Sequence, residues 1–201
     1  MSEKLEIIIL AAGNSSRLGQ AKQLVTLHGE SLLTRQCKIA KKITANVSCV
    51  LGFQAQKMKQ HIHDSSIKIV VNEQWQEGLA SSISKGVAVI DEDTTAVMLM
   101  LVDQWQLEVK HYLRLKNRWL TKPEHIISAG QLINDKELTT PPVIFPAYCF
   151  SHLVQLSSGS GAKSVIKRFH HHLISELMPE AFVDLDIPEQ LQKLKNSEVC
   201  R

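Results

Sequence analysis

Short apolar runs with no polar side constrain the fold of this chain. Residues 6–12, EIIILAA, contain four large apolar residues in succession, and residues 96–103, AVMLMLVD, are more apolar still. A strand of this composition is buried on both faces, which is typical of parallel sheets that helices cover on each side. These two runs therefore predict buried strands of an α/β fold.

Strand and helix patterns alternate along the rest of the chain. Further strands are predicted at residues 47–52, 67–72, 125–130 and 182–187. Helices are predicted at residues 32–43, 78–90, 107–120, 150–156, 162–173 and 188–195. The polar, proline-containing segment 131–146 indicates an irregular excursion over a ligand crevice. The alternation predicts a three-layer α/β/α sandwich with a mostly parallel, Rossmann-like sheet, built as one domain over residues 1–201.

The composition indicates a globular protein. Of the 201 residues, 44% are hydrophobic and 21% are charged. No apolar run reaches the roughly 18 residues that a membrane-spanning helix needs, and the start of the sequence has no signal-peptide pattern. We therefore expect a cytoplasmic protein whose four cysteines are reduced. A formal net charge of +3 without a basic cluster argues against nucleic-acid binding.

The loop that leaves the first predicted strand carries residues that suit phosphate binding. Ligands of open α/β sheets bind outside the carboxyl ends of the strands, where this loop is expected to lie. Gly13 allows backbone N–H groups to approach a phosphate, and Ser15 and Ser16 add hydroxyl donors. Arg17 and Lys22 add positive charge. The combination predicts a site for a polyphosphate.

Two familiar phosphate motifs do not fit this loop. A P-loop has the pattern GxxxxGK[ST], whereas Gly13 and Gly19 are six positions apart and Lys22 is followed by Gln23. The dinucleotide-binding pattern GxGxxG is also missing from the loop. The phosphate site must therefore be of another class.

The loop resembles that of a known enzyme family. Residues 10–24, LAAGNSSRLGQAKQL, are similar to the signature LAAGxSxRMGxxKxLL of the nucleotidyltransferases that activate the molybdenum cofactor, in particular the molybdenum cofactor cytidylyltransferases. Further blocks follow in the family's order: NEQWQEGLASSISKG, VMLMLVDQ, PPVIFPAYCFSHLVQLSSGSGAK and VDLDIPEQL. The resemblance covers residues 7–191, which is nearly the whole chain.

The resemblance implies a fold of the nucleotide-diphospho-sugar transferase type and a specific reaction. In that reaction a cytidylyl group passes from CTP to the phosphate of molybdopterin, pyrophosphate is released, and Mg²⁺ is the cofactor. An anionic nucleophile must approach an anionic triphosphate, so cations are required. The implied partners are CTP, a molybdopterin-type substrate and a recipient molybdoenzyme or its chaperone, with no nucleic acid and no membrane.

The resemblance also implies catalytic and metal-binding residues. Arg17 and Lys22 match the family's catalytic cations. Asp103 ends the most apolar predicted strand, where a carboxylate has no packing value, so a Mg²⁺ ligand is the expected role and a helix N-cap is the alternative. A second metal ligand is expected from Asp184 or Asp186, which are two positions apart on a predicted strand and hence on one face. Asp186 is alternatively the cap of the helix that follows.

Further residues are implied to bind the nucleotide. They are Leu10, Ala11 and Ala12 against the base; Gly13, Ser15, Ser16 and Gly19 at the phosphates; and Gly78 with Ser81 or Ser82 near the base and sugar. The guanylyl branch of the family typically has glycine where this chain has Ala12. The resemblance therefore favours CTP over GTP.

The chain departs from the family pattern mainly in its second half. Trp105 stands where proline is usual after the Asp-Gln pair, and Lys163 replaces the arginine of a GDxGAR turn. Two alternatives therefore stay open. One is a nucleotidyltransferase that acts on a sugar or polyol phosphate. The other is a non-catalytic carrier or chaperone of the molybdenum cofactor with the same fold, against which the presence of all the catalytic residues argues.

Overall fold

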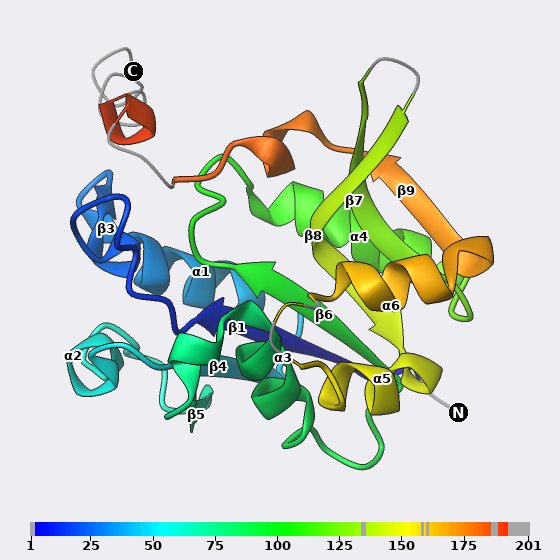
Figure 1. Cartoon of the computed structure of the whole chain (residues 1–201), viewed down its shortest axis with the longest axis horizontal. Coiled ribbons are helices and arrows are strands. Elements are labelled where there is room, and N and C mark those ends of the chain that lie inside the picture. The colour runs from blue at the N-terminus through cyan, green and yellow to red at the C-terminus, as the bar shows by residue number, and fades with distance from the viewer. Residues whose placement is uncertain (1–2, 134–135, 158, 160, 186–188, 193–201) are drawn as a thin grey trace.

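The structure is a computed structural model that describes residues 3–133, 136–157, 159, 161–185 and 189–192. A seven-stranded sheet runs through it in the order β5-β4-β1-β6-β8-β7-β9 (Figure 1). Its strands are β1 (Leu5–Ala11), β4 (Val47–Leu51), β5 (Lys68–Val71), β6 (Ala96–Leu101), β7 (Ile126–Ile133), β8 (Lys136–Pro146) and β9 (Leu173–Leu177). The short strands β2 (Thr26–Leu27) and β3 (Glu30–Ser31) form a separate hairpin.

Most neighbouring strands of the large sheet run parallel. β1 pairs in parallel with β4 and β6, β4 with β5, and β7 with β9. β8 is antiparallel to both of its neighbours, β6 and β7. The predicted mostly parallel sheet is confirmed. Because Leu10 of β1 pairs with Leu101 of β6, the carboxyl ends of these two strands lie side by side.

Helices cover both faces of the sheet, which confirms the three-layer sandwich (Figure 1). One face carries α1 (Leu32–Lys41), α2 (Ala55–Lys59) and α4 (Val109–Thr121), and the other carries α3 (Leu79–Val87), α5 (Phe150–Val154) and α6 (Lys163–Arg168). Short 3₁₀ helices are η1 (Lys22–Leu24), η2 (Trp75–Glu77), η3 (Ala147–Cys149), η4 (His170–His172) and η5 (Pro179–Phe182). Within the described part of the chain, each helix is too short or too polar to span a lipid bilayer.

The alternation of side chains along β1 explains why its sequence is apolar throughout. Ile7 and Ile9 belong to the core under α1 and α4, whereas Ile8 and Leu10 belong to the core under α3. Successive side chains of a strand point to opposite faces, so a strand covered on both sides has no polar face. Burying each of these side chains contributes about 1.5–3 kcal/mol to folding.

The prediction of irregular structure over residues 131–146 is wrong. The described residues of this segment continue β7 and form β8, which pair as an antiparallel hairpin. Pro141 and Pro142 lie outside the ladder, because the pairing with β7 jumps from Thr140 to Val143. Proline has no N–H to donate and is tolerated at such irregularities. The two prolines therefore mark a bulge and not the end of a strand.

The predicted strand at residues 182–187 is also wrong in its described part. Residues 179–182 form η5, and residues 183–185 have no regular structure. Residues 186–188, which include Asp186, lie outside the described residues. Of the helix predicted from there, residues 189–192 are helical.

β9 is the edge strand next to β7, and it was not predicted from the sequence. The predicted helix at residues 162–173 ends earlier, since α6 stops at Arg168 and η4 follows it. The histidines of η4 prolong the helical pattern in the sequence. The side chains of β9 are largely half-buried, as expected of an edge strand, so they give only a weak apolar signal.

Gly86 allows α3 to lie close to the sheet. A Cβ atom added at Gly86 would lie 2.7 Å from Cγ2 of Ile8 on β1 and 3.0 Å from Cγ2 of Val50 on β4. Both contacts are shorter than ordinary van der Waals separations. The glycine therefore sets the distance between the helix and the sheet.

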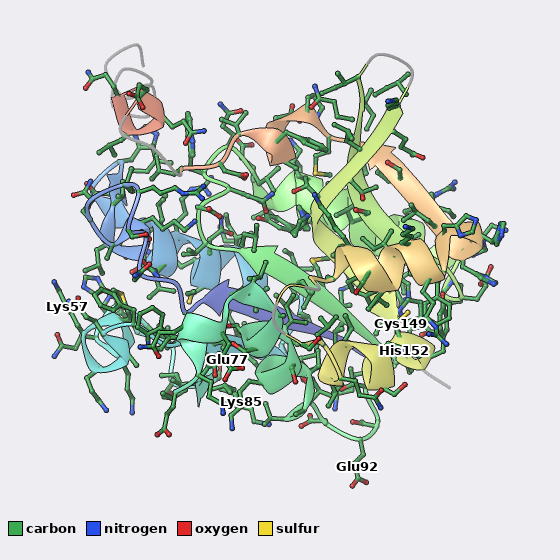
Figure 2. The ribbon with its side chains drawn as sticks, viewed as in Figure 1. Lys57, Glu77, Lys85, Glu92, Cys149 and His152 are labelled. Atoms are coloured by element: carbon green, nitrogen blue, oxygen red, sulfur yellow. The ribbon has the colours of Figure 1, made fainter. Side chains whose placement is uncertain are left out.

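We expect Gly86→Ala to destabilise the fold. Overpacking a core costs about 1–3 kcal/mol, which exceeds the gain of about 0.5–1 kcal/mol from removing a glycine from a helix. Thermal and urea unfolding measure the difference. Lys85→Ala is the control, because Lys85 is an exposed residue of the same helix (Figure 2), and its change should stay within about 0.5 kcal/mol. A Gly86→Ala variant as stable as the wild type would contradict this packing.

Candidate functional site

The loop after β1 curls back onto η1, so that Lys22 follows a tight turn. Ser15 and Gly19 have φ angles of 53° and 74°, in the left-handed region that favours glycine. Oγ of Ser15 accepts a hydrogen bond from the backbone N–H of Lys22 at 3.2 Å. This bond joins the middle of the loop to the start of η1. The loop therefore presents Lys22 beside the carboxyl end of β1.

Lys22 forms an ion pair with Asp103 at this edge of the sheet. Nζ of Lys22 donates to Oδ2 of Asp103, which lies two residues beyond β6. The side chain of Asp103 is 6% exposed and that of Lys22 is 20% exposed. The alternative role of Asp103 as a helix N-cap is wrong, because α4 is capped by Glu108. A carboxylate buried at the edge of a sheet is therefore matched by a cation from the loop.

A cavity of about 550 Å³ opens at this ion pair. Its lining comprises Leu10, Ala12, Gly13, Asn14, Lys22, Trp75, Gln76, Gly78, Leu79, Ser82, Leu101, Asp103 and Asp184. A smaller cavity of about 230 Å³ is lined by Gly13, Asn14, Ser15, Ser16, Arg17, Lys22 and Leu185. The two cavities share Gly13, Asn14 and Lys22; Arg17 lines the smaller one and Asp103 the larger one. We call them the main and the side cavity.

Most of the residues expected at the site line one of these cavities. Leu10, Ala12, Gly13, Lys22, Gly78, Ser82, Asp103 and Asp184 line the main cavity, and Gly13, Ser15, Ser16, Arg17 and Lys22 line the side cavity. Ala11 does not, because its side chain belongs to the core on the opposite face of the sheet. Gly19 instead lines a cavity on the α2 side of the loop. Asp186 lies outside the described residues.

The two candidate serines of α3 differ in their surroundings. Ser82 lines the main cavity, whereas Oγ of Ser81 donates to the carbonyl oxygens of Gln74 and Gly78 at 3.0 and 2.9 Å. Nδ2 of the buried Asn72 reaches both serine oxygens, at 2.9 Å for Ser81 and 3.1 Å for Ser82. Ser81 and Asn72 therefore fix the start of α3, and Ser82 faces the cavity.

Sequence reasoning missed several lining residues of the main cavity: Asn14, Trp75, Gln76, Leu79 and Leu101. Asn14 lies inside the loop signature, and Leu101 is the last residue of β6, two positions before Asp103. Leu79 is 48% exposed at the first turn of α3, although it is apolar. The sequence feature that could have identified Leu79 as a lining residue is its apolar side chain directly after Gly78.

The carboxylates of the main cavity have the chemistry of a magnesium site. Mg²⁺ prefers oxygen ligands and is usually held by one or two carboxylates together with water and substrate phosphates. Asp103 and Asp184 both line the main cavity. Among the described residues, no group of three or more histidine, cysteine, aspartate or glutamate side chains is arranged to hold a metal. The residues present thus fit a metal that is shared with a phosphate ligand.

Sequence comparisons with known proteins match most of the chain. The sequence model of the MobA-like NTP transferase domain matches residues 7–173. The chain is 22% identical over 189 residues to the molybdenum cofactor cytidylyltransferase of Escherichia coli (strain K12), with 92% of each chain covered. It is 25% identical over 169 residues to the purine catabolism protein PucB of Bacillus subtilis (strain 168), with 80% of this chain and 79% of that one covered.

The fold is also similar to solved structures. The crystal structure of Rv0371c from Mycobacterium tuberculosis H37Rv matches with a TM-score of 0.80 at 22% identity, covering 96% of this chain and 98% of that one. A structure of Rv0371c in complex with manganese matches with a TM-score of 0.75 at 20% identity, covering 96% and 99%. At these identities the likeness establishes the fold.

Cys149 and His152 lie at the opposite end of the molecule from α2, which carries Lys57 (Figure 2). Pro146 at the end of β8 pairs with Ala96 at the start of β6, so the following residues lie at the amino ends of the parallel strands. Burial raises the pKa of the Cys149 thiol to about 12. This thiol is therefore neither near the cavities nor ionised at neutral pH.

We expect Cys149 to resist alkylation in the folded protein. With its pKa near 12, the reactive thiolate is a fraction of order 10⁻⁴ of the thiol at pH 8, whereas an unfolded cysteine, with a pKa near 8.5, is about one quarter ionised. Iodoacetamide labelling followed by peptide mass spectrometry should show at least a ~100-fold slower reaction than in urea-unfolded chain. Equal rates in the two states would contradict the raised pKa.

Proposed function

Because the chain belongs to the MobA-like NTP transferase family, we propose that it transfers a cytidylyl group from CTP to the phosphate of molybdopterin, in an Mg²⁺-dependent reaction. The chain is a nucleotidyltransferase related to molybdenum cofactor cytidylyltransferase. The observation that carries the proposal is the Lys22–Asp103 ion pair in the wall of the main cavity. The proposed partners are CTP and molybdopterin, with a recipient molybdoenzyme or its chaperone taking the product.

The proposed reaction is a substitution at phosphorus. An oxygen of the molybdopterin phosphate attacks the α-phosphorus of CTP, the bond from that phosphorus to the bridging oxygen breaks, and pyrophosphate leaves. Negative charge increases on the leaving oxygens, so preorganised cations lower the barrier. Lys22 and Arg17 supply these cations in the proposal. Lys22 is common to both cavities, which supports its contact with the triphosphate.

The metal in the proposal is held by Asp103 and Asp184. Bound Mg²⁺ would neutralise phosphate oxygens and help the pyrophosphate to leave. The position of both carboxylates in one cavity supports this assignment, and the manganese complex of Rv0371c supports a divalent metal in general. The protein's own residues orient the triphosphate: Lys22 pairs with its charge, and the loop of Gly13, Ser15 and Ser16 offers backbone and hydroxyl donors.

The walls of the main cavity support a pyrimidine nucleotide. Leu10, Leu79 and Leu101 provide apolar surface that suits the flat face of a base, and Ser82 adds a polar group. Ala12 lines the same cavity and its methyl group occupies space that glycine would leave open. This difference favours the smaller cytosine over guanine.

Pyrophosphate release tests the proposed function and its rivals. CTP, GTP, ATP and UTP are each supplied with Mg²⁺, with molybdopterin, with a sugar or polyol phosphate, or with neither. Release that requires CTP and molybdopterin supports the proposal. Release with a sugar or polyol phosphate in place of molybdopterin contradicts the proposed acceptor. Tight binding of molybdopterin without release contradicts an enzymatic role.

We expect Lys22→Ala and Asp103→Ala each to lower the turnover rate by at least ~100-fold, because both residues act on charge in the transition state. Steady-state release of pyrophosphate measures the effect. Lys85→Ala is the matched control, since this exposed lysine does not line either cavity. A near-wild-type rate for Lys22→Ala or Asp103→Ala would remove that residue from the mechanism.

Asp184→Asn should weaken metal binding by about tenfold or more, because it removes one of two carboxylates. The fall of the free Mn²⁺ signal in electron paramagnetic resonance, with CTP present, measures binding without turnover. Glu77→Gln is the control: Glu77 is an exposed carboxylate of η2, near the start of α3, and does not line the cavity (Figure 2). Equal Mn²⁺ affinity in Asp184→Asn and the wild type would exclude Asp184 as a ligand.

A further inference from the structure

Two buried glutamines directly follow the two residues of the central ion pair: Gln23 follows Lys22, and Gln104 follows Asp103. We propose that both are positioning residues, which hold the lysine and the aspartate against each other in the wall of the main cavity. The expected effect on the transfer rate rests on the proposed function, whereas the expected effect on the positions of Lys22 and Asp103 does not. Neither glutamine lines the main or the side cavity.

Gln23 ties η1 to the turn after β1. Its side chain is fully buried. Nε2 donates to the carbonyl oxygen of Ala11 at 2.9 Å and to that of Gly13 at 2.6 Å. Ala11 is the last residue of β1, and Gly13 begins the phosphate loop. One amide group therefore fixes the loop's departure from the strand, and with it the backbone that carries Lys22.

Gln104 makes corresponding contacts next to the other member of the ion pair, Asp103. Its side chain is also fully buried. Nε2 donates to the carbonyl oxygen of Pro141 on β8 and, at 2.7 Å, to that of Ala181 in η5. These two segments follow Gln104 by 37 and 77 positions in the sequence. The amide thus ties the end of β6, where Asp103 lies, to the second half of the chain.

The chemistry of the partners explains why the residue is glutamine in both places. All four partners are backbone carbonyl oxygens, which only accept hydrogen bonds, so both hydrogens of each NH₂ group are used. The two side-chain oxygens are buried and make no hydrogen bond within the described part of the chain. Each side chain acts as a pure donor. A glutamate cannot replace it, because an ionised carboxylate only accepts.

The reaction rate should depend on these contacts, because Lys22 lies on a very short helix, η1. η1 has three residues, and its N-cap residue, Ala21, makes no side-chain hydrogen bond to it. The Gln23 contacts add to the hydrogen bond from the Lys22 N–H to Ser15 in holding the backbone of Lys22 in place. A displacement of about 1 Å in a catalytic group can cost 10²-fold in rate. We therefore expect Gln23→Met and Gln104→Met to lower kcat by about 10- to 100-fold, while KM for CTP changes by less than about threefold.

Double-mutant cycles distinguish positioning from a general loss of stability. If Gln23 acts through Lys22, Gln23→Met should lower single-turnover rates in the wild type but by less than about twofold in Lys22→Ala. The same holds for Gln104→Met in the wild type and in Asp103→Ala. Ser48→Ala is the control, because it removes a buried polar contact to Glu6 elsewhere in the sheet. It should lower the unfolding temperature and leave kcat unchanged.

Labelling of Lys22 tests the same inference without substrates. The rate at which an amine-acylating reagent modifies Lys22, measured by peptide mass spectrometry, should rise at least about fivefold in Gln23→Met and approach the rate in Asp103→Asn. If the wild type transfers no nucleotide, the proposed function fails, and labelling still decides the positioning role. Equal rate losses in both backgrounds of a cycle, or unchanged labelling of Lys22, would overturn the inference.

Discussion

The parallel pairing of β1 with β6 is the constraint on which the site depends. It brings the loop after one strand and the aspartate after the other to the same edge, although Lys22 and Asp103 are 81 positions apart. Burying a carboxylate at that edge would be costly without a partner, and the ammonium of Lys22 offsets this cost. The two apolar strands, which helices cover on both faces, thus lead directly to the polar Lys22–Asp103 pair beyond their carboxyl ends.

Apolar runs supply the signal for the strands that the sequence predicts correctly: β4 and β6 are buried on both faces, whereas β5 also carries exposed residues. The strands at residues 47–52, 67–72, 96–103 and 125–130 are confirmed as β4, β5, β6 and β7. The errors lie where that signal is weak or ambiguous. Prolines usually interrupt strands, but Pro141 and Pro142 occupy a bulge of β8. β9 is an edge strand with half-buried side chains, and the histidines before it extend a helical pattern.

For the site as well, residues within one contiguous segment are easier to predict from the sequence than residues that the tertiary structure brings together. The loop residues could be identified because their pattern is contiguous in the sequence, and their cavity follows from the topology. Ala11 illustrates the limit: it lies in the signature beside Ala12, yet the alternation of the strand turns it into the opposite core. Gln76 lines the cavity through the position of η2, which the pattern of its own segment does not reveal.

The main cavity draws its walls from residues as far apart in the sequence as Leu10 and Asp184. During synthesis on the ribosome, the strands β1, β4, β5 and β6 emerge early and have partners among themselves. Asp184 follows β9, the last strand of the sheet in the sequence, so it emerges after all seven strands. A nascent chain therefore contains the loop after β1 and Asp103 long before it contains Asp184, so the lining of the main cavity can be completed only late in synthesis.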